Sequence, residues 1–157
     1  GIYNLYGSVI VPTQYTSIYK EGGKYLVEND SLKGIVNTYG STVIPCKYNT
    51  IEYEDGVYYV SAGGKYGIYN RYGSTIIPCQ YDEIISLGHR YIVKRDKKFG
   101  VYNQYGSTIL PCQFQKIECL NNGHYVTTRD KSQQVYNAYG ALLENRTNMK
   151  VVFSTED

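Results

Sequence analysis

One segment of the sequence recurs at a nearly constant interval, and this recurrence limits the possible folds more than any other feature. The copies begin at residues 1, 34, 67, 100 and 134, which gives intervals of 33, 33, 33 and 34 residues. Repetition at this length is typical of arrays in which each copy forms a small structural unit that packs on its neighbours. We therefore predict a single repeat domain over residues 1–157, with the last copy acting as a truncated cap.

Each copy opens with the pattern of a β-hairpin. In the third copy, two runs of β-forming residues flank the segment Asn70-Arg71-Tyr72-Gly73. Asparagine at the start of a turn bonds back to the turn backbone, and glycine at its end adopts positive φ without strain. The same pair recurs in every copy, so these residues are predicted to set the turns: Asn4 and Gly7, Asn37 and Gly40, Asn70 and Gly73, Asn103 and Gly106, Asn137 and Gly140.

The remainder of each copy reads as further β-structure. A proline is expected to end the second strand of the hairpin in four copies, at Pro12, Pro45, Pro78 and Pro111. An aromatic residue three positions ahead of isoleucine then predicts a bend or bulge, and a glycine-containing turn precedes another β-rich run. Each copy is therefore predicted to form three or four short antiparallel strands.

The predicted fold class is all-β, with tandem antiparallel repeats of 33 residues forming an open, curved, solenoid-like stack. A five-bladed β-propeller is the alternative. The hairpin half occurs five times and the second half four times, which favours the open stack because five complete blades need one more second half.

Tyrosine dominates the aromatic composition, with 20 tyrosines, three phenylalanines and no tryptophan. One tyrosine precedes each turn glycine, so the repetition predicts a row of rings along one edge, able to stack on sugars or to contact a protein. The alternative is that each ring packs over the turn of the neighbouring copy and holds the array together. The candidate binding residues are Tyr6, Tyr39, Tyr72, Tyr105 and Tyr139.

Charge and hydropathy argue against two classes of partner. The chain carries 16 basic and 14 acidic residues, scattered or in short clusters rather than gathered into a strongly basic segment. Nucleic-acid binders concentrate basic charge on one face, so no nucleic-acid partner is expected. The longest apolar runs are only a few residues, so no membrane insertion is expected either.

The four cysteines do not resemble a disulfide framework. Cys46, Cys79 and Cys112 occupy one repeat position, directly after proline, and Cys119 stands apart. We expect them to be reduced and packed as small apolar residues. Unpaired cysteines and the absence of a signal peptide in this segment favour the cytoplasm, although the compartment stays open. The chain begins inside a repeat, which suggests a fragment or a processed chain.

No catalytic or metal-binding set is evident. His89 and His124 each follow a glycine, but no acidic residue or cysteine recurs beside them, so they are expected to be exposed loop residues. Asp82 and Glu83 form a carboxylate pair in one copy only, and no second carboxylate is nominated across a cleft. We therefore predict no enzyme activity, no metal and no cofactor.

The third copy resembles the WG-repeat family of bacterial β-repeat proteins. The resemblance rests on Lys65-Tyr66-Gly67-Ile68-Tyr69-Asn70, then Gly73, then Ile76-Ile77-Pro78 and Tyr81-Asp82-Glu83-Ile84. The family's tryptophan is replaced by Tyr66 and Phe99 in the third and fourth copies, and by Lys33 and Gln133 in the second and fifth. The resemblance implies an interaction or ligand-binding module without catalytic residues.

Taken together, these features favour a non-catalytic module that binds a protein partner, or another domain of the parent chain, through an extended β surface. The alternative is a glycan or cell-wall binding module that holds polysaccharide on the tyrosine row. An enzyme is the third hypothesis, and it would require a deep pocket lined by clustered ionisable residues.

Overall fold

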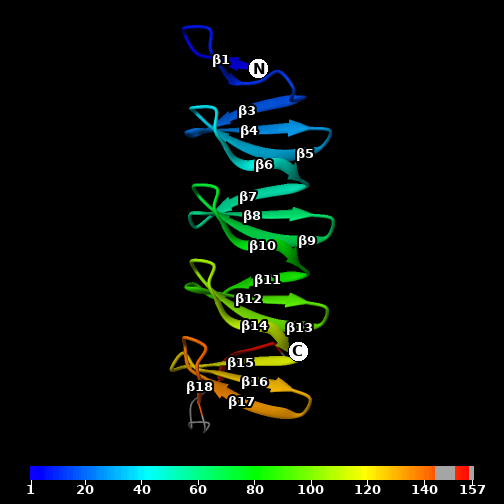
Figure 1. Cartoon of the computed structure of the whole chain (residues 1–157), viewed down its shortest axis with the longest axis vertical. Helices are drawn as coiled ribbons and strands as arrows, with labels where there is room; N and C mark the ends of the chain where they lie inside the picture. The colour runs from blue at the N-terminus through cyan, green and yellow to red at the C-terminus, as the bar shows by residue number, and fades with distance from the viewer. Residues whose placement is uncertain (144–150, 156–157) are drawn as a thin grey trace. The chain divides into compact units, whose positions relative to one another are not determined.

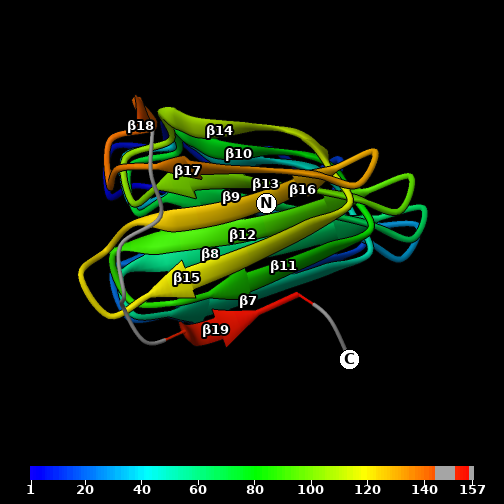
Figure 2. The ribbon, with the colours of Figure 1, turned by 90° about the horizontal axis from the view of Figure 1, so that it is seen from below.

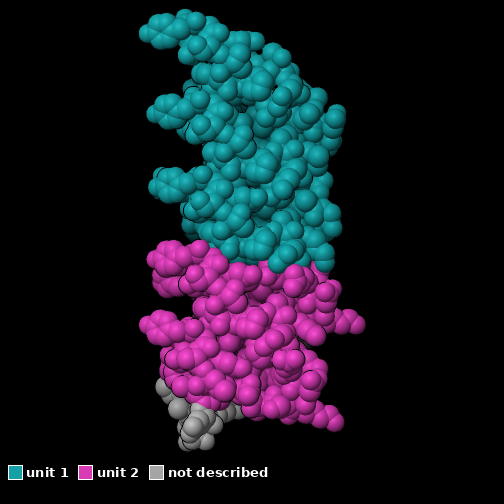
Figure 3. Space-filling model, viewed as in Figure 1, with its two compact units in different colours: residues 1–80 teal, residues 81–157 magenta. Residues whose placement is uncertain are grey.

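The computed structural model describes residues 1–143 and 151–155, and within these ranges the chain consists of strands and turns with no helix. The chain divides into two compact units, residues 1–80 and 81–157, which are coloured separately in Figure 3. Each unit is a series of antiparallel sheets, so the predicted all-β class is confirmed. None of the described residues form a helix long and apolar enough to cross a bilayer.

The first unit contains a two-stranded hairpin followed by two four-stranded sheets (Figure 1). The hairpin pairs β1 (Ile2–Tyr3) with β2 (Val9–Val11). The next sheet has the order β3-β4-β5-β6, and the last has the order β10-β9-β8-β7. Their bounds are β3 Ser17–Glu21, β4 Lys24–Asn29, β5 Leu32–Asn37, β6 Thr42–Tyr48, β7 Thr50–Glu54, β8 Val57–Ala62, β9 Lys65–Asn70 and β10 Thr75–Tyr81.

The second unit contains a four-stranded sheet, in the order β11-β12-β13-β14, and a five-stranded sheet, in the order β18-β17-β16-β15-β19. Figure 2 shows the last strand, β19, running alongside β15, and the two strands pair antiparallel. The bounds are β11 Glu83–Ser86, β12 Arg90–Arg95, β13 Lys98–Asn103, β14 Thr108–Phe114, β15 Lys116–Leu120, β16 Tyr125–Arg129, β17 Ser132–Tyr136, β18 Leu142–Leu143 and β19 Val151–Ser154.

Apart from the two-stranded sheet of β1 and β2, each sheet joins the second half of one sequence copy to the hairpin of the next. The sheet of β3 to β6, for example, covers residues 17–48, whereas the second sequence copy begins at residue 34. The sequence repeat does not show where one sheet ends and the next begins, because the turns within and between the copies contain similar turn-forming residues. The hydrogen bonding across β4 and β5 therefore decides which strands share a sheet.

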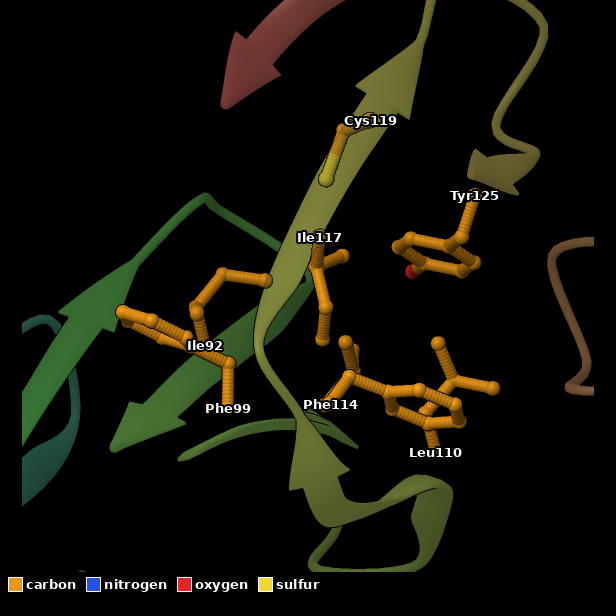
Figure 4. Packing of buried hydrophobic residues seen from close by; sticks show 8 residues of the cluster. Ile92, Phe99, Leu110, Phe114, Ile117, Cys119 and Tyr125 are labelled. Atoms are coloured by element: carbon orange, nitrogen blue, oxygen red, sulfur yellow. The ribbon is translucent and has the colours of Figure 1, made fainter. Parts of the chain in front are cut away.

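The core lies between consecutive sheets of one unit. In the first unit, Ile35 and Ile44 from β5 and β6 pack with Tyr58 and Val60 from β8. In the second unit, Figure 4 shows Leu110 and Phe114 of β14 gathered with Ile117 and Tyr125 of the following sheet. Because apolar residues from two sheets share each cluster, the predicted stacking of tandem repeats is confirmed within each unit.

A bulge opposite glycine shapes the last strand of each four-stranded sheet. In the second unit, Phe99 pairs with Phe114 and Val101 with Leu110, so the segment from Pro111 to 113 lies opposite Gly100 alone. A Cβ on Gly100 would lie only 2.8 Å from the backbone nitrogen and Cα of Cys112. Gly34 and Gly67 stand in the same relation to Cys46 and Cys79, at 2.7 Å.

The structure corrects the prediction about proline and confirms the bend expected after it. The expectation that proline ends the strand is wrong for Pro45, Pro78 and Pro111, since β6, β10 and β14 continue for three residues beyond each of them. Proline is tolerated there because the strands lie at the sheet edge, where a missing N–H costs little. The bend expected between the aromatic residue and the following isoleucine is present at Asn49, Asp82 and Gln115, each of which separates two strands, and in the first copy β2 does end at Val11, before Pro12.

Candidate functional site

The asparagine turns have the geometry that the sequence predicts. The side-chain Oδ1 of Asn70 accepts hydrogen bonds from the backbone N–H of Tyr72, at 2.9 Å, and of Ser74, at 3.0 Å. The N–H of Gly73 donates to the carbonyl of Asn70 at 3.1 Å, and Gly73 has φ of +92°. The other copies have the same pattern, with φ of +82° at Gly7, +90° at Gly40, +94° at Gly106 and +89° at Gly140.

The five candidate tyrosines all project into solvent. Their exposed fractions are 93% for Tyr6, 90% for Tyr39, 77% for Tyr72, 79% for Tyr105 and 89% for Tyr139. Figure 3 shows groups of atoms projecting from the same edge on which the hairpin turns lie in Figure 1, in each unit taken by itself. Rings with this exposure do not pack over the turn of the neighbouring repeat, so that alternative is wrong.

The turn glycine, rather than the tyrosine, makes the contact between repeats. A Cβ on Gly40 would lie 2.6 Å from the carbonyl oxygen of Ile10 in the preceding repeat. Gly73 approaches the carbonyl of Val43 in the same way, and in the second unit Gly140 approaches that of Ile109. The glycine thus serves two purposes, since it adopts positive φ and it lets the turn rest against the preceding strand.

A hollow of about 510 Å³ lies beside the turn of the second sheet in the first unit. The Nζ of Lys24 lies 3.9 Å from the ring centre of Tyr53 and 4.7 Å from that of Tyr58, which also line the hollow. The two rings are themselves 4.8 Å apart. Asn37, Arg71 and Glu21 complete its polar lining.

A hollow of about 340 Å³ occupies the corresponding place in the second unit. The guanidinium of Arg90 lies 5.2 Å from the ring centre of Tyr125, and its Nη1 donates to the Tyr125 hydroxyl at 3.2 Å. Burial raises the pKa of Tyr125, while the charge of Arg90 acts in the opposite direction. Asn103, Ser107 and the exposed Tyr139 also line this hollow.

The two hollows are built from equivalent repeat positions. Lys24 pairs across its sheet with the turn residue Asn37, and Arg90 pairs in the same register with Asn103. In each case the cation lies against a tyrosine near the start of a central strand of the next sheet, Tyr58 in β8 or Tyr125 in β16. The sequence did not lead to a prediction of either hollow. It does contain one signal for them, since Lys24-Tyr25 and Arg90-Tyr91 are equivalent cation–tyrosine pairs 66 residues apart.

The two histidines have different environments. His89 is exposed, and its Nδ1 lies 3.1 Å from Oε1 of Gln104. His124 is partly buried, contrary to expectation, and its Nδ1 has no hydrogen-bond partner among the described residues. Over residues 1–143 and 151–155, no group of three or more His, Cys, Asp and Glu side chains is arranged to hold a metal ion.

The cysteines are all unpaired thiols, and three of them cap carbonyl groups across the bulge. The thiol of Cys46 donates to the carbonyl of Leu32 at 3.1 Å, that of Cys79 to Lys65 at 3.3 Å, and that of Cys112 to Lys98 at 3.1 Å. Burial raises the pKa of all three, and it raises the pKa of the fully buried Cys119 to about 11. The raised pKa values favour the protonated thiols near neutral pH, and a protonated thiol is a poor nucleophile.

Two solved structures align with most of this chain at low similarity. The crystal structure of the WD40 β-propeller domain of Doa1 aligns with a TM-score of 0.34 and 11% identity, over 94% of this chain and 57% of that chain. The N-terminal domain of Nup159 aligns with a TM-score of 0.34 and 10% identity, over 90% of this chain and 44% of that chain. This chain thus spans about half the length of the solved chains. No curated protein sequence matches it significantly.

The family comparison is more specific. A family model described as "WG containing repeat" matches three segments, residues 34–66, 66–98 and 99–129. These segments cover more than half of the 157 residues and include Gly34, Gly67 and Gly100, the glycines that face the bulges. The chain belongs to the WG-repeat family.

Proposed function

We propose that this chain is a non-catalytic interaction module that binds a partner protein along the edge formed by its hairpin turns. The observation that supports the proposal is the exposure of the turn tyrosines, of which Tyr72, the most covered, is still 77% exposed. Large aromatic side chains with a polar tip are enriched at protein interfaces, because they bury much area while losing little conformational entropy.

The turns hold these rings on a rigid support. Each tyrosine sits in a turn whose backbone is closed by two hydrogen bonds to the preceding asparagine side chain, as at Asn37 and Asn70. A preorganised backbone leaves only the side-chain rotamers to be ordered on binding, which lowers the entropic cost of association. The rings recur once per repeat, so a partner that contacts several of them gains from multivalency.

The test is a phage-displayed library of random peptides, screened in parallel with a glycan array. Peptides selected by the intact chain are expected to lose about tenfold or more in affinity for the Tyr39→Ala/Tyr72→Ala/Tyr105→Ala variant, because exposed aromatic anchors dominate such interfaces. The matched control is Tyr19→Ala/Tyr66→Ala, which removes tyrosines that are 58% and 47% exposed and lie in strands. This control is expected to keep its affinity.

Two results would overturn the proposal. Retention of polysaccharides by the intact chain, lost in the triple variant and without any selected peptide, would assign the row to glycan binding. Peptide binding that is equal in the triple variant and the control would remove the turn tyrosines from the interface.

A further inference from the structure

The two hollows beside the turns share a chemical bias toward hydrogen-bond donors. In the first unit, Lys24 and Arg71 bring two cations to a lining with one carboxylate, that of Glu21. In the second unit, Arg90 is a cation and no carboxylate among the described residues lines the hollow. Both hollows therefore carry an excess positive charge, although the whole chain has a net charge of only +2.

The asparagines strengthen this bias. Oδ1 of Asn37 already accepts the N–H groups of Tyr39 and Ser41, and Oδ1 of Asn103 accepts those of Tyr105 and Ser107. Since an amide side chain has one oxygen acceptor and one NH₂ donor group, the turn engages the oxygen and leaves the NH₂ for other partners. The groups offered to a ligand are thus mainly the ammonium or guanidinium and the asparagine NH₂, which stand opposite each other across the sheet.

The cations are held in position by tyrosine rings rather than by acids. Lys24 rests on the faces of Tyr53 and Tyr58, and Arg90 on Tyr125. Tyr58 is 4% exposed and Tyr125 is 1% exposed, so both platforms are fixed by the core. Among the described residues, no carboxylate forms an ion pair with Lys24 or Arg90. A ring face orients a cation without neutralising it, so the charge stays available to an anion.

We infer that each hollow is a binding site for the carboxylate of an acidic side chain, supplied by an extended segment of the partner protein. The inference rests on the proposed function, because it takes the ligand to be a peptide, and it adds the chemistry that the peptide must carry. The cation and the opposite asparagine NH₂ donate to the carboxylate, while the exposed turn tyrosine next to each hollow, Tyr72 beside Arg71 and Tyr139, covers the neighbouring part of the peptide. Hollows of about 300–1,000 Å³ are of the size that commonly accepts small groups.

The residues that line the two hollows favour a peptide ligand over an acidic glycan. The apolar part of the lining combines tyrosine rings with a strand residue next to the donors, Val43 in the first unit and Ile109 in the second. That combination matches the methylene groups and carboxylate of glutamate. A sugar ring would instead need paired donors and acceptors for its hydroxyl groups, and the acceptors of Asn37 and Asn103 are already engaged.

The test titrates a blocked oligoglutamate peptide into the isotopically labelled chain and follows the side-chain NH₂ signals of Asn37 and Asn103 by NMR. The glutamate peptide is expected to shift both signals, and its oligoglutamine counterpart is expected to shift neither. Lys24→Met should weaken binding at Asn37 by about tenfold and leave Asn103 unchanged, whereas Arg90→Gln should do the reverse, because one charge-assisted contact is lost at each site.

Control variants distinguish binding in the hollow from nonspecific charge attraction and from the effects of misfolding. Lys20→Met and Lys131→Met remove exposed lysines that line neither hollow, and both variants should bind as the intact chain does. Lys24→Arg and Arg90→Lys keep the charge and should retain binding. A dispersed amide spectrum confirms that each variant is folded.

Three outcomes would overturn the inference. The first is an equal response to oligoglutamate and oligoglutamine, and the second is unchanged binding in Lys24→Met and Arg90→Gln. The third is a response to oligogalacturonate alone, which would place a glycan carboxylate in the hollows. If any of these occurs while the tyrosine variants still lose their selected peptides, the interaction module stands and only the carboxylate assignment fails.

Discussion

At the scale of single residues, tyrosine takes opposite environments according to its place relative to the turn. Tyr125 lies in a strand and is 1% exposed, whereas Tyr139 lies in a turn and is 89% exposed. Some strand tyrosines pair their hydroxyl groups, as in the bond of 2.7 Å between the hydroxyls of Tyr81 and Tyr102. Burial, and then the hydrogen bond with Tyr69, raises the pKa of Tyr48 well above its usual range. The exposed turn tyrosines have no hydroxyl partner of this kind among the described residues.

The most strongly shifted thiol leads to a prediction about pH. Burial raises the pKa of Cys119 from 9.0 to about 11, so the folded chain holds this proton more tightly than the unfolded chain does. Stability from this group is complete below pH 9 and is lost as the pH rises toward 11, because the unfolded state ionises first. Above the folded pKa, this loss in the free energy of unfolding approaches about 3 kcal/mol.

The measurement compares urea unfolding of the intact chain and Cys119→Ala at several pH values. The variant is expected to be less stable near neutral pH, because it leaves a cavity in the core around Ile117 and Phe114. The difference in unfolding free energy should narrow between about pH 9 and pH 11, since other titrating groups are common to both proteins. A difference that stays constant over this range would contradict the prediction.

At the scale of elements, the bulge opposite glycine sets the shape of each four-stranded sheet. Gly34, Gly67 and Gly100 allow the backbone of the facing cysteine to come closer than any side chain permits. In the fifth copy Gln134 stands at this position, and the described pairing of β17 with β18 is limited to Val135 with Leu143 and Tyr136 with Leu142. The glycine of the family signature is therefore a packing requirement of the strand pair.

Replacing this glycine is expected to destabilise the fold. Gly67→Ala would place a Cβ 2.7 Å from the backbone of Cys79, so β9 and β10 must separate. We expect a loss of about 1–3 kcal/mol in the free energy of unfolding, the usual cost of overpacking. Chemical denaturation of the intact chain and of Gly67→Ala measures this loss.

Gly23→Ala is the matched control for this prediction, because a Cβ at that position has no neighbour within 4 Å and the backbone φ is not positive. It is expected to leave stability nearly unchanged. Equal effects of the two substitutions would show that lost glycine flexibility, rather than the contact with Cys79, governs the result.

At the scale of the whole molecule, the protection of backbone amides from hydrogen exchange should increase with the number of strands and sheets that pack on each strand within its unit. The hairpin of β1 and β2 is a two-stranded sheet, and isolated hairpins are marginal in water. The middle strands of the four-stranded sheets have paired strands on both sides and buried residues on both faces, as in β5, where Ile35 and Val36 enter different core clusters.

We therefore predict a gradient in hydrogen exchange. The amides of β1 and β2 should exchange near the rate of an unfolded chain, whereas those of β4, β5, β8 and β9 should exchange only through larger opening events. Exchange followed by mass spectrometry resolves these segments. Uniform protection over residues 1–70 would contradict the prediction, because it would mean that the first hairpin unfolds together with the sheets.

The sequence alone determined the repeat interval, the all-β class and the five turns. It also offered solvent exposure of the turn tyrosines as one of two alternatives. These features depend on local chemistry, since Asn70 and Gly73 specify a turn through φ and short-range hydrogen bonds. Which strands share a sheet, why Pro78 can lie within a strand, and how Lys24 meets Tyr58 were decided only by the tertiary structure. Such contacts join residues from different copies, and a repeat pattern states the spacing of residues along the chain but not the register or the distance at which copies pack.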